Sequence, residues 1–194
     1  MKEFTKRQIE ILMASVEIIS DSGIQNLTTR NLSDKIGISV PAIYRHFKNK
    51  NDILLNILYY FGIKIEKGFS EIISSDMSSL EKIEKLFMTQ ITNLNKNKCL
   101  SAIIFTDEYF KNEKDLNQEI VRITMFNISM YQDIIEKGQR DLEIKNDLPT
   151  KQLTLMLLGS LHAFLKTWRM LDYSFDLLEE GEKMVKTLIF LLKK

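Results

Sequence analysis

The chain contains little of what interrupts helices. Its 194 residues include only two prolines and seven glycines, and long stretches contain neither. Because these two residue types destabilise helix interiors most, their scarcity favours an all-α protein. A hydrophobic content of 44% is enough for a chain of this length to bury a core and form one or two domains.

Cysteine is almost absent, which excludes a disulfide framework. Cys99 has no partner for an intramolecular bridge, and this usage fits a reduced, cytoplasmic compartment. The two histidines, His46 and His162, lie far from each other and from Cys99, so their spacing is not that of a zinc site. We expect no metal and no cofactor.

Long apolar runs are missing as well, and we expect the first residues not to be a signal peptide. The most apolar stretch, residues 153–165, includes His162 and is shorter than the roughly 20 residues that span a bilayer. The first residues carry mixed charge, and Glu10 and Glu17 interrupt the apolar positions that follow, unlike a signal peptide. We therefore expect no membrane partner.

The sequence also lacks recognisable catalytic motifs. Cys99 has no histidine nearby in the sequence, and neither a glycine-rich phosphate loop nor a His-Glu-x-x-His motif is present. Asp107 and Glu108 are interpreted as a solvent-facing helix end. The sequence predicts that the protein is not an enzyme.

Residues 24–54 carry the most informative pattern. Thr28 is suited to cap a short helix, in which Leu32 and Ile36 share one face. Gly37 follows directly, where a left-handed residue would end that helix without a side-chain clash. The chain is predicted to turn there.

A second short helix is expected after the turn. Ser39 is predicted to cap it, Pro41 falls in its first turn, and Ile43 and Phe47 face inward. The residues left more or less outward are small or polar: Ser39, Val40, Ala42, Tyr44, Arg45 and His46. Small residues permit close approach to a DNA groove, and the polar ones reach phosphates and base edges. Asn49 then caps a longer helix. The pattern is a helix-turn-helix.

Residues 27–32 (LTTRNL) and 37–50 (GISVPAIYRHFKNK) together resemble the DNA-binding domain of the TetR family of transcriptional regulators. The resemblance covers roughly the first third of the chain, and the remainder is similar in length and helical character. It implies an all-α fold with an N-terminal three-helix DNA-binding domain (residues 1–48) and a C-terminal helical bundle for ligand binding and dimerisation (residues 49–194).

The predicted DNA contacts are Thr28, Thr29, Arg30, Ser39, Val40, Pro41, Ala42, Tyr44, Arg45, His46, Lys48 and Lys50. Four of them have a plainer alternative: Tyr44 and His46 as packing residues, Lys48 and Lys50 as a solvated pair. Arg45 suits either a guanine or a phosphate. The first 50 residues carry eight Lys or Arg against five Asp or Glu, a balance of +3 in a chain of net charge +1, which fits phosphate contact by one end.

Apolar periodicity and cap residues predict the remaining helices. A first helix follows a Thr5–Gln8 capping box and ends near residues 22–23, the helix after Asn49 continues to about Phe69, and the others begin at Ser78, at Asp115 or Asn117, at Thr150 and at Asp176. Those from Thr150 and Asp176 are apolar on more than one face. A second apolar stripe favours a homodimer through the last two helices over burial of both helices within one monomer.

Met and aromatic residues of the second domain indicate a small hydrophobic or amphipathic effector. The tentative ligand-binding residues are Phe87, Met88, Ile91, Phe105, Arg122, Met125, Phe126, His162 and Trp168. Arg122, Asn127, Tyr131 and His162 are candidates for the polar end of the pocket. Ordinary core packing would produce the same composition.

Two hypotheses follow for function. The first is a ligand-released repressor that binds a palindromic double-stranded DNA operator as a homodimer, with ligand-promoted binding left open. The second is a helical small-molecule carrier or an enzyme, in which the helix-turn-helix is only a structural corner. The outward Ser39, Ala42, Tyr44 and Arg45 favour the first.

Overall fold

The computed structural model describes residues 3–104 and 113–194, and these residues form an all-α fold. The helices are α1 (Lys6–Ser22), η1 (Ile24–Asn26), α2 (Thr29–Ile36), α3 (Val40–Tyr44), α4 (Lys50–Ile73), α5 (Ser79–Lys96), α6 (Lys98–Ile104), α8 (Lys114–Arg140), α9 (Thr150–Met170) and α10 (Leu177–Leu192). Within the described ranges, extended pairing is limited to an isolated bridge between Ile144 and Lys193.

The helix ends follow the predicted capping residues. Thr5 and Gln8 form a reciprocal capping box at α1, and the Asp176 carboxylate accepts from two backbone amides at the start of α10. Ser78 and Glu81 make the same kind of box before α5, which lowers the pKa of the Glu81 carboxyl. Such caps satisfy amides that have no partner inside the helix, so the sequence fixes where these helices begin.

Three expectations differ from the structure. α4 continues to Ile73, beyond the predicted end near Phe69, because Phe69 and Ile72 are both buried and prolong its apolar face. Lys98–Ile104 is a separate helix that the sequence reading did not assign. Ser39 occupies the cap position of α3, but its side chain makes no capping hydrogen bond.

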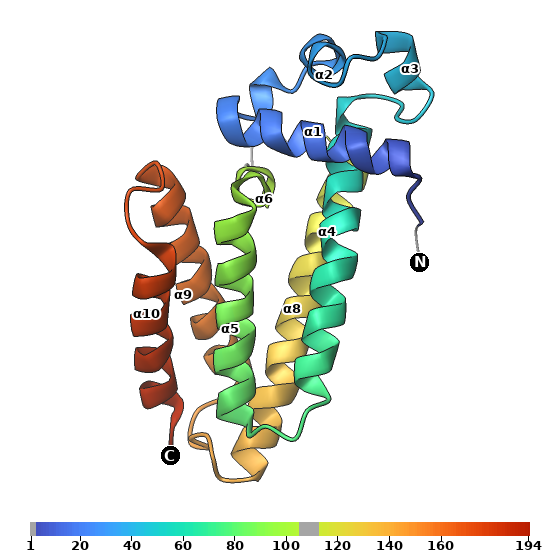
Figure 1. Cartoon of the computed structure of the whole chain (residues 1–194). Helices are drawn as coiled ribbons and strands as arrows, with labels where there is room; N and C mark the ends of the chain where they lie inside the picture. Colours follow the sequence, from blue (N-terminus) through green and yellow to red (C-terminus); the bar gives the residue numbers. More distant parts are fainter. Residues whose placement is uncertain (1–2, 105–112) are drawn as a thin grey trace. The chain divides into compact units, whose positions relative to one another are not determined.

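The chain forms two compact units that alternate along the sequence. The first comprises residues 1–65 and 97–121, and the second residues 66–96 and 122–194. In the first unit α1 packs against α2, η1 and α6 (Figure 1). Ile11, Leu12, Leu27 and Leu32 are almost completely buried in its core. The predicted functional boundary after residue 48 stays a prediction.

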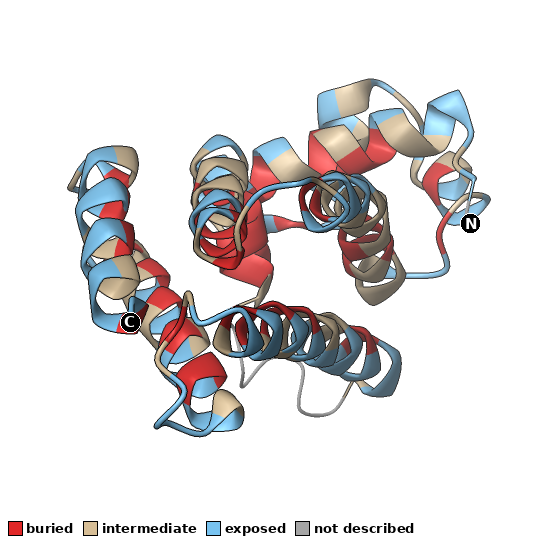
Figure 2. Cartoon of the chain, turned by 90° about the horizontal axis from the view of Figure 1, so that it is seen from below, coloured by how far each residue is buried: buried red, intermediate tan, exposed pale blue. Residues whose placement is uncertain are grey.

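In the second unit, α10 packs along α5 (Figure 1). Gly181 permits this approach, because a Cβ there would lie 2.9 Å from the Ile91 side chain. Trp168 anchors the connection from α9 to α10, since its indole N–H donates to the Phe175 carbonyl at 3.1 Å. Figure 2 shows that buried residues occupy one side of α10 and exposed residues the other.

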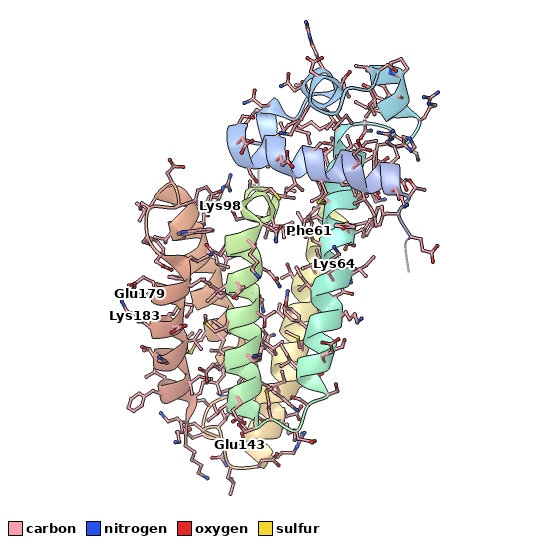
Figure 3. All side chains as sticks on the ribbon, viewed as in Figure 1. Phe61, Lys64, Lys98, Glu143, Glu179 and Lys183 are labelled. Carbon is pink, nitrogen blue, oxygen red and sulfur yellow. The ribbon has the colours of Figure 1, made fainter. Side chains whose placement is uncertain are left out.

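At the other end of this unit, Glu143 joins distant segments. Its carboxylate accepts a 2.8 Å hydrogen bond from the Ser79 backbone amide, which has no partner inside α5 (Figure 3). The neighbouring Gly138 is close-packed, because a Cβ there would approach Ile144 to 2.6 Å and Ser79 to 2.8 Å. A glycine is therefore required for packing at this position.

Candidate nucleic-acid interface and ligand site

The turn between α2 and α3 is set by local hydrogen bonds. The Thr28 hydroxyl accepts from the Asn31 amide at 3.1 Å and caps α2. Gly37 has φ +68°, and its amide donates to the Ser33 carbonyl, which ends the helix as predicted. The Ser33 hydroxyl donates to the Ile38 carbonyl across the turn. These bonds fix the direction in which the chain enters α3.

α3 is anchored by two apolar side chains and presents its other residues outward. Ile43 and Phe47 are 1% and 2% exposed, as predicted from their spacing. Ser39, Pro41, Tyr44 and Arg45 are exposed, whereas Val40, Ala42 and His46 are half-buried. The Tyr44 side chain is 51% exposed despite its aromatic ring. The face therefore combines small residues with a phenol and a guanidinium, which can reach phosphates and base edges.

The start of α4 is braced by a reciprocal pair. The Asn49 side chain accepts from the Asp52 amide, and the Asp52 carboxylate accepts from the Lys48 amide, both at 2.8 Å. The Lys48 side chain remains exposed. The Lys50 ammonium instead donates to the Ile24 carbonyl at 2.5 Å, so it holds α4 against η1. Of the two predicted lysine contacts, only Lys48 is fully available at the surface.

The remaining predicted contacts lie at the start of α2. Thr28 and Arg30 are exposed and Thr29 is half-buried. An arginine and hydroxyl side chains at this position can bind phosphate oxygens, which orient a protein on DNA without reading its sequence. The twelve predicted residues lie on α2 and α3, in the segments that flank them and at the start of α4, and their contact with DNA stays a prediction.

The predicted ligand residues are more dispersed. Phe87 and Ile91 are buried on α5, and Trp168 is buried on α9, where its N–H is already used. Met88 and Phe126 are half-buried, whereas Met125 is 58% exposed and His162 is exposed. Phe105 lies outside the described residues. The ligand role of all nine stays a prediction.

Arg122 is held by an ion pair with Glu66 at 2.8 Å. Both side chains are about one third to one half exposed, so the pair contributes little to stability. A hollow of about 340 Å³ elsewhere in the second unit is lined by Phe164, Phe175, Asp176, Glu179 and Glu180, none of which was predicted to bind ligand.

The sequence reading missed Gln90. Its amide donates to the hydroxyl of the fully buried Tyr131 at 3.0 Å, linking α5 to α8. Burial raises the pKa of Tyr131, and the Gln90 bond opposes that shift only in part. Gln90 occupies the apolar stripe of α5 together with Phe87, Ile91 and Leu94, and this break in the pattern could have marked it as unusual.

The described residues show neither a metal-binding cluster nor a membrane-spanning helix. His, Cys, Asp and Glu side chains form no group of three that could hold a metal ion there. No helix in those ranges is both long enough and apolar enough to span a membrane.

Two known protein families together match nearly the whole chain. Residues 11–57 match the family described as bacterial regulatory proteins, tetR family. Residues 61–191 match the family described as YsiA-like protein, C-terminal region.

Individual proteins are similar to this chain over almost its whole length. The fatty acid metabolism regulator protein of Bacillus subtilis is 26% identical over 189 residues, 97% of each chain. The solved structure of the fatty acid degradation regulator FadR from Bacillus halodurans has a TM-score of 0.84 at 18% identity, covering 97% of each chain. That of FadR from Bacillus subtilis in complex with stearoyl-CoA has a TM-score of 0.80 at 24% identity, covering 95% of this chain and 98% of that one.

Proposed function

Because this chain belongs to the tetR family of bacterial regulatory proteins, we propose that it represses transcription by binding a palindromic DNA operator as a homodimer. Binding of a small amphipathic effector then releases the operator. As a member of the family the chain is a DNA-binding transcriptional regulator. The observation that carries the proposal is the outward face of α3, where Pro41, Tyr44 and Arg45 are exposed over a buried Ile43.

In this proposal α3 enters the major groove. Arg45 reads a base edge, because its fork can bond both acceptors of a guanine. Tyr44, Lys48 and Arg30 bind phosphates on either side of the groove. His46 and Lys50 contribute less, since His46 is half-buried and the Lys50 ammonium is bonded within the fold.

Dimerisation is proposed to use the outer faces of α9 and α10. On α9, Leu155, Met156 and Met170 are 51%, 61% and 75% exposed, and on α10 Phe190 and Leu191 are 78% and 54% exposed. Exposed apolar residues in such numbers on two adjacent helices mark an interaction surface. A two-fold axis would bring each face against its own copy. The ion-paired Glu179 and Lys183 of α10 would lie at the polar rim (Figure 3).

The effector is proposed to be a long-chain fatty acyl thioester. The name of the Bacillus subtilis relative points to fatty acid metabolism, and a protein of the same fold binds stearoyl-CoA. Buried apolar side chains on α5 and α9 suit the acyl chain. Because the ligand binds one conformation better than the other, it shifts the protein away from the DNA-competent state.

Selection of bound sequences from random duplex DNA tests this proposal. The purified protein should enrich an inverted repeat whose half-sites lie about 34 to 36 Å apart or a multiple of that distance. Stearoyl-CoA should then lower operator affinity at least tenfold at fixed salt. Absence of an enriched repeat with a folded dimer would contradict the repressor reading. An enriched repeat that stearoyl-CoA leaves bound would contradict only the effector class.

Two variants separate the roles of α3 and α4. Lys48→Ala should weaken binding to all sequences and reduce the salt slope by about one, whereas Arg45→Ala should relax preference at one base pair, at a cost of about 1–3 kcal/mol. Lys137→Ala, at an exposed position of α8, is the matched control and should change neither.

A further inference from the structure

A row of polar side chains lies inside the second compact unit, between α5 and α8. Gln90 comes from the apolar stripe of α5, and Tyr131 comes from α8. Tyr131 is 0% exposed, and its ring makes an edge contact with Phe87 with ring centroids 5.7 Å apart. A buried hydroxyl in such surroundings must hydrogen-bond or lose the solvation it had in water.

Asn127 lies one helical turn before Tyr131 on α8. Its side-chain amide donates to the Ile123 carbonyl at 3.0 Å. That bond fixes the orientation of the amide group, because a flip would put two oxygens face to face. The Asn127 Oδ1 is then left buried without any hydrogen-bond partner. Such an orphaned acceptor destabilises a fold by itself, so it calls for an explanation.

The Gln90–Tyr131 pair has hydrogen-bond donors to spare. Together the two side chains carry three polar hydrogens, and the single bond between them uses one. If the Gln90 amide were reversed, the hydroxyl would donate to it instead, and two N–H groups would remain. Either orientation leaves a spare donor on this pair, and Tyr131 lies four positions after Asn127, one turn away on the same face of α8.

We infer that Gln90, Asn127 and Tyr131 form the polar end of the effector site and bind an uncharged group that both accepts and donates, such as a secondary amide or a hydroxyl. This inference rests on the proposed function, because it names the chemistry of the ligand that the second compact unit holds. The apolar part of the ligand would lie along the stripe of Phe87 and Ile91 on α5.

The same residues discriminate against a free carboxylate. An anion would face the Asn127 Oδ1, which is itself an acceptor and repels it. Among the described residues, Arg122 and Lys82 do not compensate: Arg122 on α8 is paired with Glu66, and the buried Lys82 is two turns from Gln90 along α5, about 12 Å away. The raised pKa of Tyr131 keeps its hydroxyl protonated, so it remains a neutral donor. The site therefore favours fatty amides and thioesters with amide-bearing arms over fatty acids.

Two probes with the same chain test this preference: N-dodecanoylethanolamine, which carries an amide and a hydroxyl, and dodecanoic acid. Calorimetric titration of the full-length protein at pH 8 should show at least tenfold tighter binding of the amide. Asn127→Leu and Tyr131→Phe should each weaken amide binding about five- to tenfold, and neither should weaken acid binding. Equal affinity of wild type for both probes, or variants that bind the amide as wild type does, would overturn the inference.

Thermal unfolding provides a second readout. Asn127→Leu removes the orphaned acceptor, so the melting temperature without ligand should rise. If Asn127 had only a structural role, Asn127→Leu would have a lower melting temperature than wild type, and this result would overturn the inference. Ser129→Leu, at an exposed position of the same helix, is the matched control and should alter neither amide binding nor the melting temperature.

A DNA-release assay separates this inference from the proposed function. If stearoyl-CoA releases the operator from wild type and Asn127→Leu at the same concentration and amide binding is also unchanged, the polar site is wrong while the regulator reading stands. If the amide preference depends on Asn127 and Tyr131 but stearoyl-CoA releases no DNA, the polar site stands and the proposed effector is wrong.

Discussion

The helix-turn-helix region, residues 24–54, and the interior of the second compact unit use polar side chains in opposite ways. In the first region, Thr28, Ser33 and Asn49 bond backbone groups that are three to five positions away. In the second, the Gln90 side chain donates to Tyr131 across 41 positions, and the Glu143 side chain accepts from the Ser79 backbone amide across 64. Apart from Lys50, whose ammonium reaches the Ile24 carbonyl across 26 positions, the bonds of the first region join near neighbours in the sequence, whereas those of the second form only once the helices have packed.

This difference also separates two kinds of recognition. DNA has a regular, charged surface, and a short helix that presents outward side chains is sufficient to meet it. A small amphipathic molecule must be enclosed, so its partners are drawn from helices that are distant in the sequence. Substitutions in the two regions should therefore differ in what they disturb, and the following four are ordered from the largest expected effect to the smallest.

Leu32→Ala tests how far local signals alone hold the helix-turn-helix region. Leu32 is 0% exposed in the core of the first unit, so its truncation should lower the free energy of unfolding by about 3 kcal/mol. Chemical denaturation measures this loss. Val121→Ala, at a 53% exposed position, should cost less than about 0.5 kcal/mol. If Leu32→Ala lowered the free energy of unfolding as little as Val121→Ala does, local capping would be sufficient for the stability of this region.

Gly138→Ala tests the dependence of the second unit on distant contacts. The added Cβ would lie 2.6 Å from Ile144 and 2.8 Å from Ser79, so overpacking should lower the free energy of unfolding by about 1–3 kcal/mol. Gly68→Ala, on α4 in the same unit, is the matched comparison, because nothing lies within 4 Å of its added Cβ. In a helix this change should stabilise by about 0.5–1 kcal/mol. Equal effects at the two glycines would contradict the packing described.

Asn49→Ala removes a purely local interaction. The side chain caps α4 through the Asp52 amide, so its loss should lower the free energy of unfolding by about 1 kcal/mol. Asn49→Asp keeps an acceptor oxygen and should retain most of the stability. An alanine variant as stable as wild type would show that Asp52 braces this helix end without Asn49.

The pH dependence of stability tests whether the Cys99 thiol is buried. Burial raises the pKa of its thiol to about 12, against 9.0 as the ordinary value. The folded state therefore keeps its proton where the unfolded state loses it, so stability is full below pH 9 and falls as pH rises above it. Between pH 8 and 9.5 the wild type should lose about 0.8 kcal/mol more than Cys99→Ala. Parallel pH profiles for the two proteins would mean that this thiol is exposed.

The contrast between the two regions explains what the sequence could predict. Thr5, Thr28, Gly37, Asn49 and Asp176 fixed helix ends correctly, because capping depends on neighbours. The Ser39 hydroxyl failed as a cap and α6 was not assigned, since short elements depend on surrounding packing. Periodicity showed that Phe87 and Ile91 lie inside. It could not show that Gln90 would meet Tyr131, because that contact needs the register of α5 against α8.

Reciprocal coupling is the most direct test of the central claim, that this chain links DNA binding to effector binding. Operator affinity should be measured with and without stearoyl-CoA, and stearoyl-CoA affinity with and without operator. A ligand-released repressor predicts that each lowers the affinity of the other by the same factor, at least tenfold here. If stearoyl-CoA binds equally well with and without saturating operator DNA, the two activities are independent, and a carrier whose helix-turn-helix is only structural becomes the better description.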